Sequence, residues 1–395
     1  RYPVGFSGDA IITWDSLRFQ PYLTATSSNI GYTWWSHDIG GHFKGYKDEE
    51  LALRWFQFGV FSPINRLHSS NSAFSSKEPW KYSIGVRQNM TEALRLRHAL
   101  IPYLYTLNVL NSEEGIPVIQ PVYYKYPHEE SAYHIKNEYF FGSELLVLPV
   151  TSNKDDETLY GSEVFYFPEG QWFDVFTNFR YKGQSELKVF RDETTIPVFA
   201  KEGSIIPLDP APTETDAHNL PENMDWLIYP GASNTFELIE DAEDQRAVTS
   251  FELDHLEQKA VISVKDESRA VDDGRKHVIH FNASEEVTIL EVENGEVIDQ
   301  SFDPEINRTS VTVEATGDGP VTVKYQGFEA IKEQDISKEL FKRLDKAQVG
   351  YFLKDDLLNA FSSDLSDFSL LALINELEEE QLSQSLFELL YIKNS

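Results

Sequence analysis

Residues 1–112 repeat one order of positions: a short apolar run, a polar tip, and a stretch with helical periodicity. The segment 51–70 predicts a helix, then a short strand at Phe61–Ile64, then a polar end. The segment 91–115 has apolar residues at helical spacing and ends on a glycine, which predicts another helix. Such repetition is typical of β/α units, and in a closed α/β barrel the chemistry lies on loops after the carboxyl ends of the strands.

After residue 115 the pattern changes to short β-rich runs. Between 116 and 208 these runs are separated by Gly and Pro turns, which predicts a β-sandwich. Residues 209–223 are rich in Pro and polar side chains and predict a linker or long loop. A second β-rich unit follows over 224–330. From 331 the apolar positions return to helical spacing, which predicts a small bundle or interaction domain.

Composition narrows the class of protein. A length of 395 residues is enough for two or three domains, and a net charge of −31 argues against nucleic acid and anionic membranes as partners. There is no apolar run long enough for a transmembrane helix. The lack of cysteine excludes disulfides and Cys-ligated zinc and favours a cytoplasmic location. Because the chain begins at Arg1, directly on a motif-like stretch, we expect the natural N-terminus, and any signal peptide, to be missing.

The segment 4–17 carries a candidate catalytic acid. Hydrolysis of a glycosidic bond needs two carboxyl groups, which lie about 5 Å apart in retaining enzymes. The acid must keep its proton near neutral pH, and aromatic surroundings favour that. Asp9 ends an apolar run and is flanked by Phe6 and Trp14. On the local sequence alone, an Asp at a strand end is more often an N-cap or turn residue.

A second candidate, Asp38, stands beside Trp34 and Trp35 and shortly before Gly40 and Gly41. A buried carboxylate among aromatic side chains is rare unless it is paired or faces a ligand. The glycines would let the backbone approach a bound ring closely. The alternative interpretation of Asp38 is an Asx-turn.

Arg66 and His68 alternate along one short segment, so both side chains could point to the same side. The alternative is a surface Arg and a capped His. A metal site is a further interpretation of Asp38, His37, His42 and His68, but these residues lack tight ligand spacing. We therefore expect no metal and no other cofactor.

Taken together, these segments resemble glycoside hydrolase family 31. Residues 1–9 are similar to the family segment that carries the acid/base carboxylate, and residues 34–42 resemble its G-x-D-I-G-G-F element. Residues 54–70 resemble its RW-x-Q-x-G-x-F-x-P-x-x-R-x-H element. Further strings follow in the family's order at 97–107, 138–150, 164–177 and 196–208. The unit at 224–330 looks like the family's distal β domain, and the tail matches nothing familiar.

The resemblance implies a fold that combines α/β and all-β parts. Residues 1–112 would be the C-terminal part of a (β/α)8 catalytic barrel, and 113–208 a proximal C-terminal β-sandwich. Residues 209–330 would be a distal C-terminal β domain, and 331–395 a helical tail of unknown role.

The resemblance also implies roles for individual residues. Asp9 would be the general acid/base. Asp38 and His68 would hydrogen-bond sugar hydroxyls in the −1 subsite, and Arg66 would support that cluster. Phe6 falls where the family often has Trp, and would form an apolar wall.

Two departures from the family pattern bear on function. His42 falls next to the −1 subsite where Phe is usual, so a polar group there could select a different sugar or leaving group. The family's nucleophilic Asp lies on an earlier barrel strand, and no residue before Asp9 can supply it. We therefore expect a fragment of a longer chain, or one piece of an assembly.

The resemblance implies a retaining, exo-acting α-glycosidase, foremost an α-glucosidase that acts on oligosaccharides or small α-glycosides by double displacement. An α-xylosidase, another α-glycosidase or a transglycosylase of the family stays open. From other classes, a non-catalytic carbohydrate-binding or interaction module and a metal-dependent hydrolase stay open. So does the assembly, either as a homo-oligomer or with the missing N-terminal half.

Overall fold

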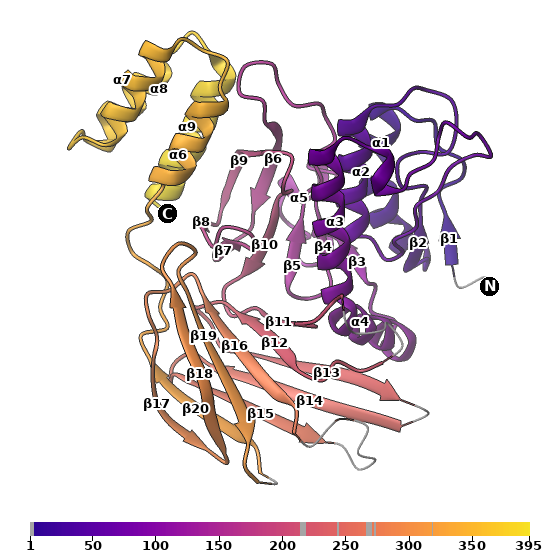
Figure 1. Ribbon diagram of the computed structural model, residues 1–395, viewed down its shortest axis with the longest axis vertical. Helices are drawn as coiled ribbons and strands as arrows, with labels where there is room; N and C mark the ends of the chain where they lie inside the picture. Colours follow the sequence, from indigo (N-terminus) through magenta and orange to yellow (C-terminus); the bar gives the residue numbers. More distant parts are fainter. Residues whose placement is uncertain (1–3, 214–218, 243–244, 266–270, 272–273, 318) are drawn as a thin grey trace.

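The computed structural model describes residues 4–395 except 214–218, 243–244, 266–270, 272–273 and 318. Figure 1 shows the N-terminal helices on one side of a central β region, a distal β domain below it, and a group of C-terminal helices above. Within the described residues, no helix combines the length and apolar character needed to cross a membrane.

The N-terminal part is organised around two short strands, β1 (Val4–Phe6) and β2 (Trp34–Ser36), which pair in parallel residue for residue. Parallel strands place their carboxyl ends at the same edge of a sheet. The loops that begin at Ser7 and His37 therefore start side by side, and these loops carry the first two candidate site residues.

The rest of this part is mainly helical, with α1 (Trp14–Thr26), α2 (Glu49–Val60), α3 (Ile84–Ala99) and α4 (Ile101–Glu114), and α2 packs on both α1 and α3. Helix α2 begins at Asp48, whose carboxylate accepts a hydrogen bond from the backbone N–H of Leu51 at 3.0 Å. From Leu51 to Val60 every residue of α2 is buried. A helix that is apolar on nearly all sides packs inside a core. Helix α2 lies behind the loop that follows β2 and supports it.

The predicted strand at Phe61–Ile64 does not form, because the chain turns at the end of α2. The first two backbone N–H groups of this segment donate to carbonyls in the last turn of α2. Pro63 has no N–H to offer a neighbouring strand. Sheet-like pairing returns further along, at the parallel bridge of Leu67 with Ile39.

A proximal β-sandwich is present, and its strands lie between Ile119 and Lys201. Its main sheet is antiparallel, in the order β3 (Ile119–Pro121), β4 (Tyr139–Phe141), β5 (Leu145–Val147), β10 (Val198–Lys201), β7 (Gln171–Asp174) and β8 (Arg180–Lys182). A second pair, β6 (Gly161–Phe167) with β9 (Ser185–Arg191), packs against it, and a short helix α5 (Ser131–His134) lies outside. Phe165, Phe167 and Tyr181 surround Phe199 with ring centroids 4.6 to 4.9 Å away, which forms the aromatic core of this unit.

The distal domain consists of two five-stranded sheets. One has the order β11 (Ile205–Leu208), β12 (Met224–Ile228), β16 (Lys276–Asn282), β19 (Arg308–Ala315) and β18 (Gly295–Asp303). The other has the order β13 (Asn234–Ala242), β14 (Gln245–Asp254), β15 (Lys259–Lys265), β20 (Val321–Gln326) and β17 (Thr288–Glu293). Strand β11 lies in the range that the sequence assigns to the proximal unit, but it pairs with β12 of the distal sheet.

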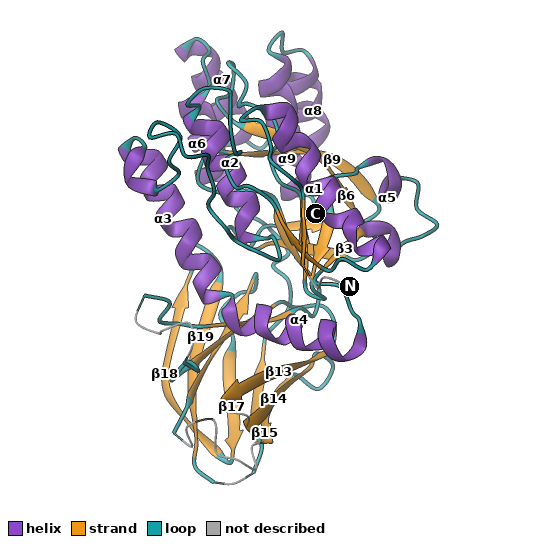
Figure 2. Cartoon of the chain, turned by 90° about the vertical axis from the view of Figure 1, so that its right-hand side faces the viewer, coloured by secondary structure: helices purple, strands orange, loops and turns teal. Residues whose placement is uncertain are grey.

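Helix α4 joins the barrel part to the distal domain. Figure 2 shows it lying across the top of that domain, and the backbone N–H of Ile239 on β13 donates to Thr106 Oγ1 at 3.0 Å. Through this contact the N-terminal part and the distal domain share one hydrophobic core.

The helical tail comprises α6 (Ser337–Lys346), α7 (Tyr351–Phe361), α8 (Asp367–Asn375) and α9 (Glu380–Lys393). Helix α9 packs on β9 and buries Leu382, Leu386 and Leu389 completely. Its Glu388, also wholly buried, forms salt bridges with Arg191 of β9 and Arg343 of α6. The tail is thus docked on the proximal β-sandwich by both apolar and charged contacts.

Candidate active site

Three chain segments meet at the edge where β1 and β2 end. The backbone N–H of His42 donates to the carbonyl of Ala10 at 2.8 Å, and the carbonyl of His42 accepts from the N–H of Ser70 at 2.8 Å. These two bonds tie the loop that holds Asp9 to the loop that holds Asp38, and both to the segment that carries Arg66 and His68.

Gly41 and Gly45 let the loop after β2 lie directly on Ile12. Both have positive φ, +79° and +70°. A Cβ at Gly41 would lie 2.9 Å from Ile12 Cα, and a Cβ at Gly45 would lie 2.3 Å from the Ile12 carbonyl oxygen. Backbone atoms cannot move aside as a side chain can, so both positions need glycine.

Asp38 lies at the centre of the site and has no exposed side-chain surface, as the sequence predicted for a buried carboxylate. Arg66 donates from Nη2 to Asp38 Oδ1 at 2.6 Å, and His68 Nε2 lies 3.8 Å from the same oxygen. The two side chains therefore face one side, in line with their alternation. The second oxygen, Asp38 Oδ2, is buried and has no hydrogen-bond partner among the residues that the structure describes.

Asp9 differs from Asp38 in exposure, since 59% of its side chain is accessible. Its Oδ2 lies 3.6 Å from His42 Nε2. An exposed carboxylate at the rim can exchange protons with solvent and with a bound molecule. A buried carboxylate such as Asp38, already bound by Arg66, can accept further hydrogen bonds only from groups that enter the site.

His42 connects the two carboxylates, a role that sequence reasoning did not identify. Its Nε2 faces Asp9, and its Nδ1 lies 3.9 Å from Asp38 Oδ2. Its ring stacks on that of His68 with centroids 4.9 Å apart and planes 17° from parallel. The only sequence signal was the presence of a histidine where an aromatic hydrocarbon was expected.

Phe6 forms part of the rim, with 45% of its surface exposed. The guanidinium carbon of Arg66 lies 5.2 Å from the centre of its ring, a cation–π contact that helps to hold the arginine in place. Trp14, which the sequence placed beside Asp9, donates its indole N–H to Asp48 at 3.0 Å.

His37, next to Asp38, is a structural residue. It is wholly buried, its Nδ1 accepts from the indole N–H of Trp55 at 3.1 Å, and its Nε2 lies 2.9 Å from Ser62 Oγ. Burial, and to a lesser degree the positive charge of Arg66, lowers the pKa of His37 to about 3. His37 therefore stays neutral, and its two side-chain hydrogen bonds fix the backbone next to Asp38.

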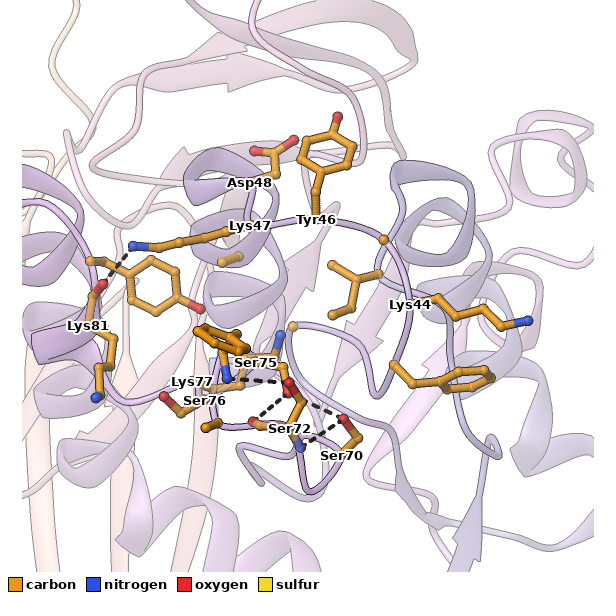
Figure 3. Close-up of a pocket in the computed structure, with 18 residues that line it drawn as sticks. Lys44, Tyr46, Lys47, Asp48, Ser70, Ser72, Ser75, Ser76, Lys77 and Lys81 are labelled. Atoms are coloured by element: carbon orange, nitrogen blue, oxygen red, sulfur yellow. Dashed lines mark hydrogen bonds between the residues drawn. The ribbon is translucent and has the colours of Figure 1, made fainter.

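A pocket of about 450 Å³ lies beside this cluster, between the loops 40–48 and 70–82 (Figure 3). The ionisable cluster side chains are not part of its lining, but Gly40, Phe43 and Ser70 each stand within two residues of one of them. Figure 3 shows Tyr46 and Asp48 on one side of the pocket and a serine-rich loop on the other. The pocket therefore lies next to the site, and the ionisable side chains of the site do not line it.

Comparison with known proteins places this geometry in a family. The profile described as the glycosyl hydrolases family 31 TIM-barrel domain matches residues 1–107, and that of the family 31 C-terminal domain matches residues 115–206. The chain belongs to glycoside hydrolase family 31. The predicted family and fold class are thereby confirmed.

Relatives within family 31 differ in their activities. An α-xylosidase of Saccharolobus solfataricus is 29% identical over 242 residues, which are 60% of this chain and 32% of the relative. Alpha-glucosidase 2 of Bacillus thermoamyloliquefaciens is 29% identical over 241 residues, which are 61% of this chain and 30% of that relative. The chain therefore spans about a third of the length of these curated relatives.

The family 31 dextranase of Flavobacterium johnsoniae, solved with isomaltotriose, superposes with a TM-score of 0.72 at 25% identity. The superposition covers 82% of this chain and 44% of the dextranase. It extends well beyond the 1–206 region that the family profiles match, so the distal β region also takes part in the likeness.

Proposed function

We propose that this chain carries the acid/base side of the active site of a retaining α-glycosidase, most simply an α-glucosidase. Asp9 is the general acid/base. Asp38 and His68 accept and donate hydrogen bonds to hydroxyls of the sugar in the −1 subsite, Arg66 holds Asp38, and Phe6 forms an apolar wall.

The observation that carries this proposal is the pairing of an exposed carboxylate with a buried, incompletely bonded one. Asp9 is open to solvent at the rim, while Asp38 Oδ2 is buried on the side of His42 and has no hydrogen-bond partner within the described part of the chain. A sugar hydroxyl that donates to Oδ2 would satisfy this oxygen. The glycosidic oxygen beside that sugar would then lie toward the rim, within reach of Asp9.

The two steps of the reaction give Asp9 two tasks. In the first it protonates the leaving oxygen while a second carboxylate attacks the anomeric carbon, and in the next it takes a proton from the water that hydrolyses the glycosyl intermediate. Asp38 is unsuited to the attack because it is buried and bound by Arg66. We propose that the nucleophile comes from a segment outside this chain, as supported by relatives of which the matched part of this chain covers only about a third.

A direct consequence is that the 395-residue chain alone should not hydrolyse glycosides. Loss of a nucleophile removes many orders of magnitude in rate. The chain is purified and assayed with an aryl α-glucoside, and no turnover above the buffer blank is expected. Turnover at an ordinary enzymatic rate would mean that the roles assigned here are wrong.

The role of Asp9 is tested in a protein that joins this chain to the upstream half of the barrel. Asp9→Ala should slow cleavage of disaccharides far more than cleavage of an α-glucosyl fluoride, because fluoride leaves with little protonation. Azide should then intercept the β-linked intermediate and give an α-glucosyl azide, with net retention. An equal loss of cleavage rate on both substrates, with β-azide or no azide product, would mean that Asp9 is a turn residue and not the acid/base.

An α-xylosidase is the second candidate, favoured by the likeness to the enzyme of S. solfataricus. The two activities differ in whether the −1 subsite accepts the hydroxymethyl group that glucose has and xylose lacks. The ratio of kcat/KM for aryl α-glucoside and aryl α-xyloside in the longer protein separates them. A ratio well below one would replace the α-glucosidase proposal.

A further inference from the structure

The cluster around His42 has a second property besides sugar binding. Asp38, His42 and His68 each offer one ligand atom, and these atoms all lie within 4.8 Å of one another. Imidazole nitrogen and carboxylate oxygen are the ligands that zinc prefers after thiolate. Sequence spacing did not indicate this grouping because the three residues come from two loops that only the fold brings together.

Two atoms of the cluster are buried without a hydrogen-bond partner, Asp38 Oδ2 and His42 Nδ1. They face each other across 3.9 Å. This separation is too long for a direct hydrogen bond. Two ligand atoms of a tetrahedral zinc ion, with bonds of about 2.0–2.2 Å, lie roughly 3.3–3.6 Å apart, so a small approach of the two side chains would place both atoms on one ion. An ion between them would satisfy both atoms at once.

Neighbouring groups orient these ligands as the surroundings of metal sites do. Arg66 occupies Asp38 Oδ1 at 2.6 Å and leaves Oδ2 as the free oxygen. Asp9 Oδ2 lies 3.6 Å from His42 Nε2, beyond hydrogen-bond range, but its negative charge favours the proton on that nitrogen and leaves Nδ1 as the lone-pair donor. A carboxylate behind a metal-bound histidine is the usual way of fixing its tautomer.

We infer that the free carboxylate oxygen of Asp38 and one ring nitrogen each from His42 and His68 form a binding site for a divalent transition-metal ion of the zinc class. Two nitrogens and one oxygen favour Zn²⁺, Co²⁺ or Ni²⁺ over Mg²⁺ and Ca²⁺, which prefer oxygen ligands. The ion plays no part in hydrolysis. It occupies the oxygen that the proposed function assigns to a sugar hydroxyl, so metal and sugar exclude each other. That exclusion rests on the proposed function, whereas metal binding does not.

The test uses the 395-residue chain and needs no activity. Zn²⁺ is titrated by calorimetry at neutral pH, and Co²⁺ is followed by the visible absorption of its tetrahedral complexes. We expect one ion per chain, and at least about tenfold weaker binding in His42→Phe. His68→Gln should weaken zinc binding by a similar factor. Circular dichroism checks that each variant is folded, and His68→Gln serves as the test of the site if His42→Phe is not.

Two controls separate the site from the acidic surface. His134→Phe removes an exposed histidine that lies 3.1 Å from Glu186, and should leave zinc binding unchanged. Mg²⁺ at the same concentration should produce no comparable heat. Zinc binding that is absent in the parent chain, equal in all folded variants, or matched by Mg²⁺ would overturn the inference.

Discussion

Asp38 and Glu388 are both carboxylates without exposed side-chain surface, yet their oxygens are used in opposite ways. Glu388 Oε1 accepts from Arg191 and from the hydroxyl of Tyr181, and Oε2 accepts from Arg343 and from the backbone N–H of Phe190. Asp38 has one oxygen bound by Arg66 and one without a partner.

The difference separates a structural charge from a functional one. A buried carboxylate that only holds a fold together needs every lone pair satisfied, and Glu388 meets that requirement with two guanidinium groups, a hydroxyl and an amide. A buried carboxylate that waits for a ligand keeps one oxygen free. Asp38 keeps that oxygen directed toward His42 rather than toward the core.

The largest effect expected from this comparison follows removal of the structural charge. Glu388→Ala takes one of two carboxylate partners from each of the buried Arg191 and Arg343, which keep only Asp174 and Glu339, and this should cost about 3–5 kcal/mol of unfolding free energy. Urea unfolding of the 395-residue chain measures it, and limited proteolysis should show early release of the tail. Glu378→Ala, at an exposed position before α9, is the matched control. A loss below about 1 kcal/mol, within the range of surface changes, would contradict the assignment.

The functional charge should show the reverse pattern. Asp38→Ala leaves Arg66, whose side chain is 40% exposed and can return to water, so stability should change by about 1 kcal/mol or less. In the longer enzyme, kcat/KM should fall by a factor on the order of a hundred, equivalent to roughly 2–3 kcal/mol. If kcat/KM stays within threefold of the parent, Asp38 is a turn residue.

The buried imidazole of His277 extends the comparison to the pH dependence of the unfolding free energy. His277 accepts from the indole of Trp226 at 3.1 Å, and burial, then the charge of Arg275, lowers its pKa to about 3. In the unfolded chain its pKa is about 6.5, so below that pH the unfolded state binds a proton that the folded state refuses. Its contribution to stability is complete above pH 6.5 and is lost as the pH falls toward 3, by up to about 1.4 kcal/mol per unit.

The measurement is unfolding free energy at pH 7 and pH 5 for the parent chain and His277→Gln. The variant should lose less stability over this interval, because the titrating group is gone. His128→Gln, which changes an exposed histidine, should follow the parent. Identical pH slopes for parent and His277→Gln would show that His277 is protonated in the folded state.

The smallest effect is expected at the rim. Phe6→Ala removes the ring beside Arg66, a half-exposed cation–π contact of about 0.5–1 kcal/mol. Thermal unfolding should shift slightly, and the matched control Phe74→Ala, at a side chain 95% exposed, should not shift at all. A loss of several kcal/mol would place Phe6 in the core rather than in the site wall.

The site could be predicted because its residues follow strand ends. Asp9 and Asp38 come after β1 and β2, and parallel pairing brings such positions together whatever the intervening residues are. Arg66 and His68 alternate on one extended segment, so a shared direction follows from backbone geometry. Their roles in catalysis stay predictions until they are measured.

What could not be predicted depends on contacts between distant segments. The apolar run at Phe61–Ile64 suits a strand, but turn bonds at the end of α2 use its N–H groups. The salt bridge of Glu388 with Arg191 joins residues 197 positions apart, and no local pattern marks it. The place of His42 between two carboxylates likewise depends on backbone bonds to Ala10 and Ser70.

The close contact of Gly41 and Gly45 with Ile12 has a consequence for how this site can change in evolution. Because the backbone on both sides of position 42 is fixed by steric contact, a new side chain there alters the chemistry between the carboxylates without moving them. One codon could therefore exchange a hydrocarbon ring for an imidazole, or back, at little cost to the fold. Among changes to this site, a substitution at position 42 would alter the chemistry within a lineage at the smallest loss of folding stability.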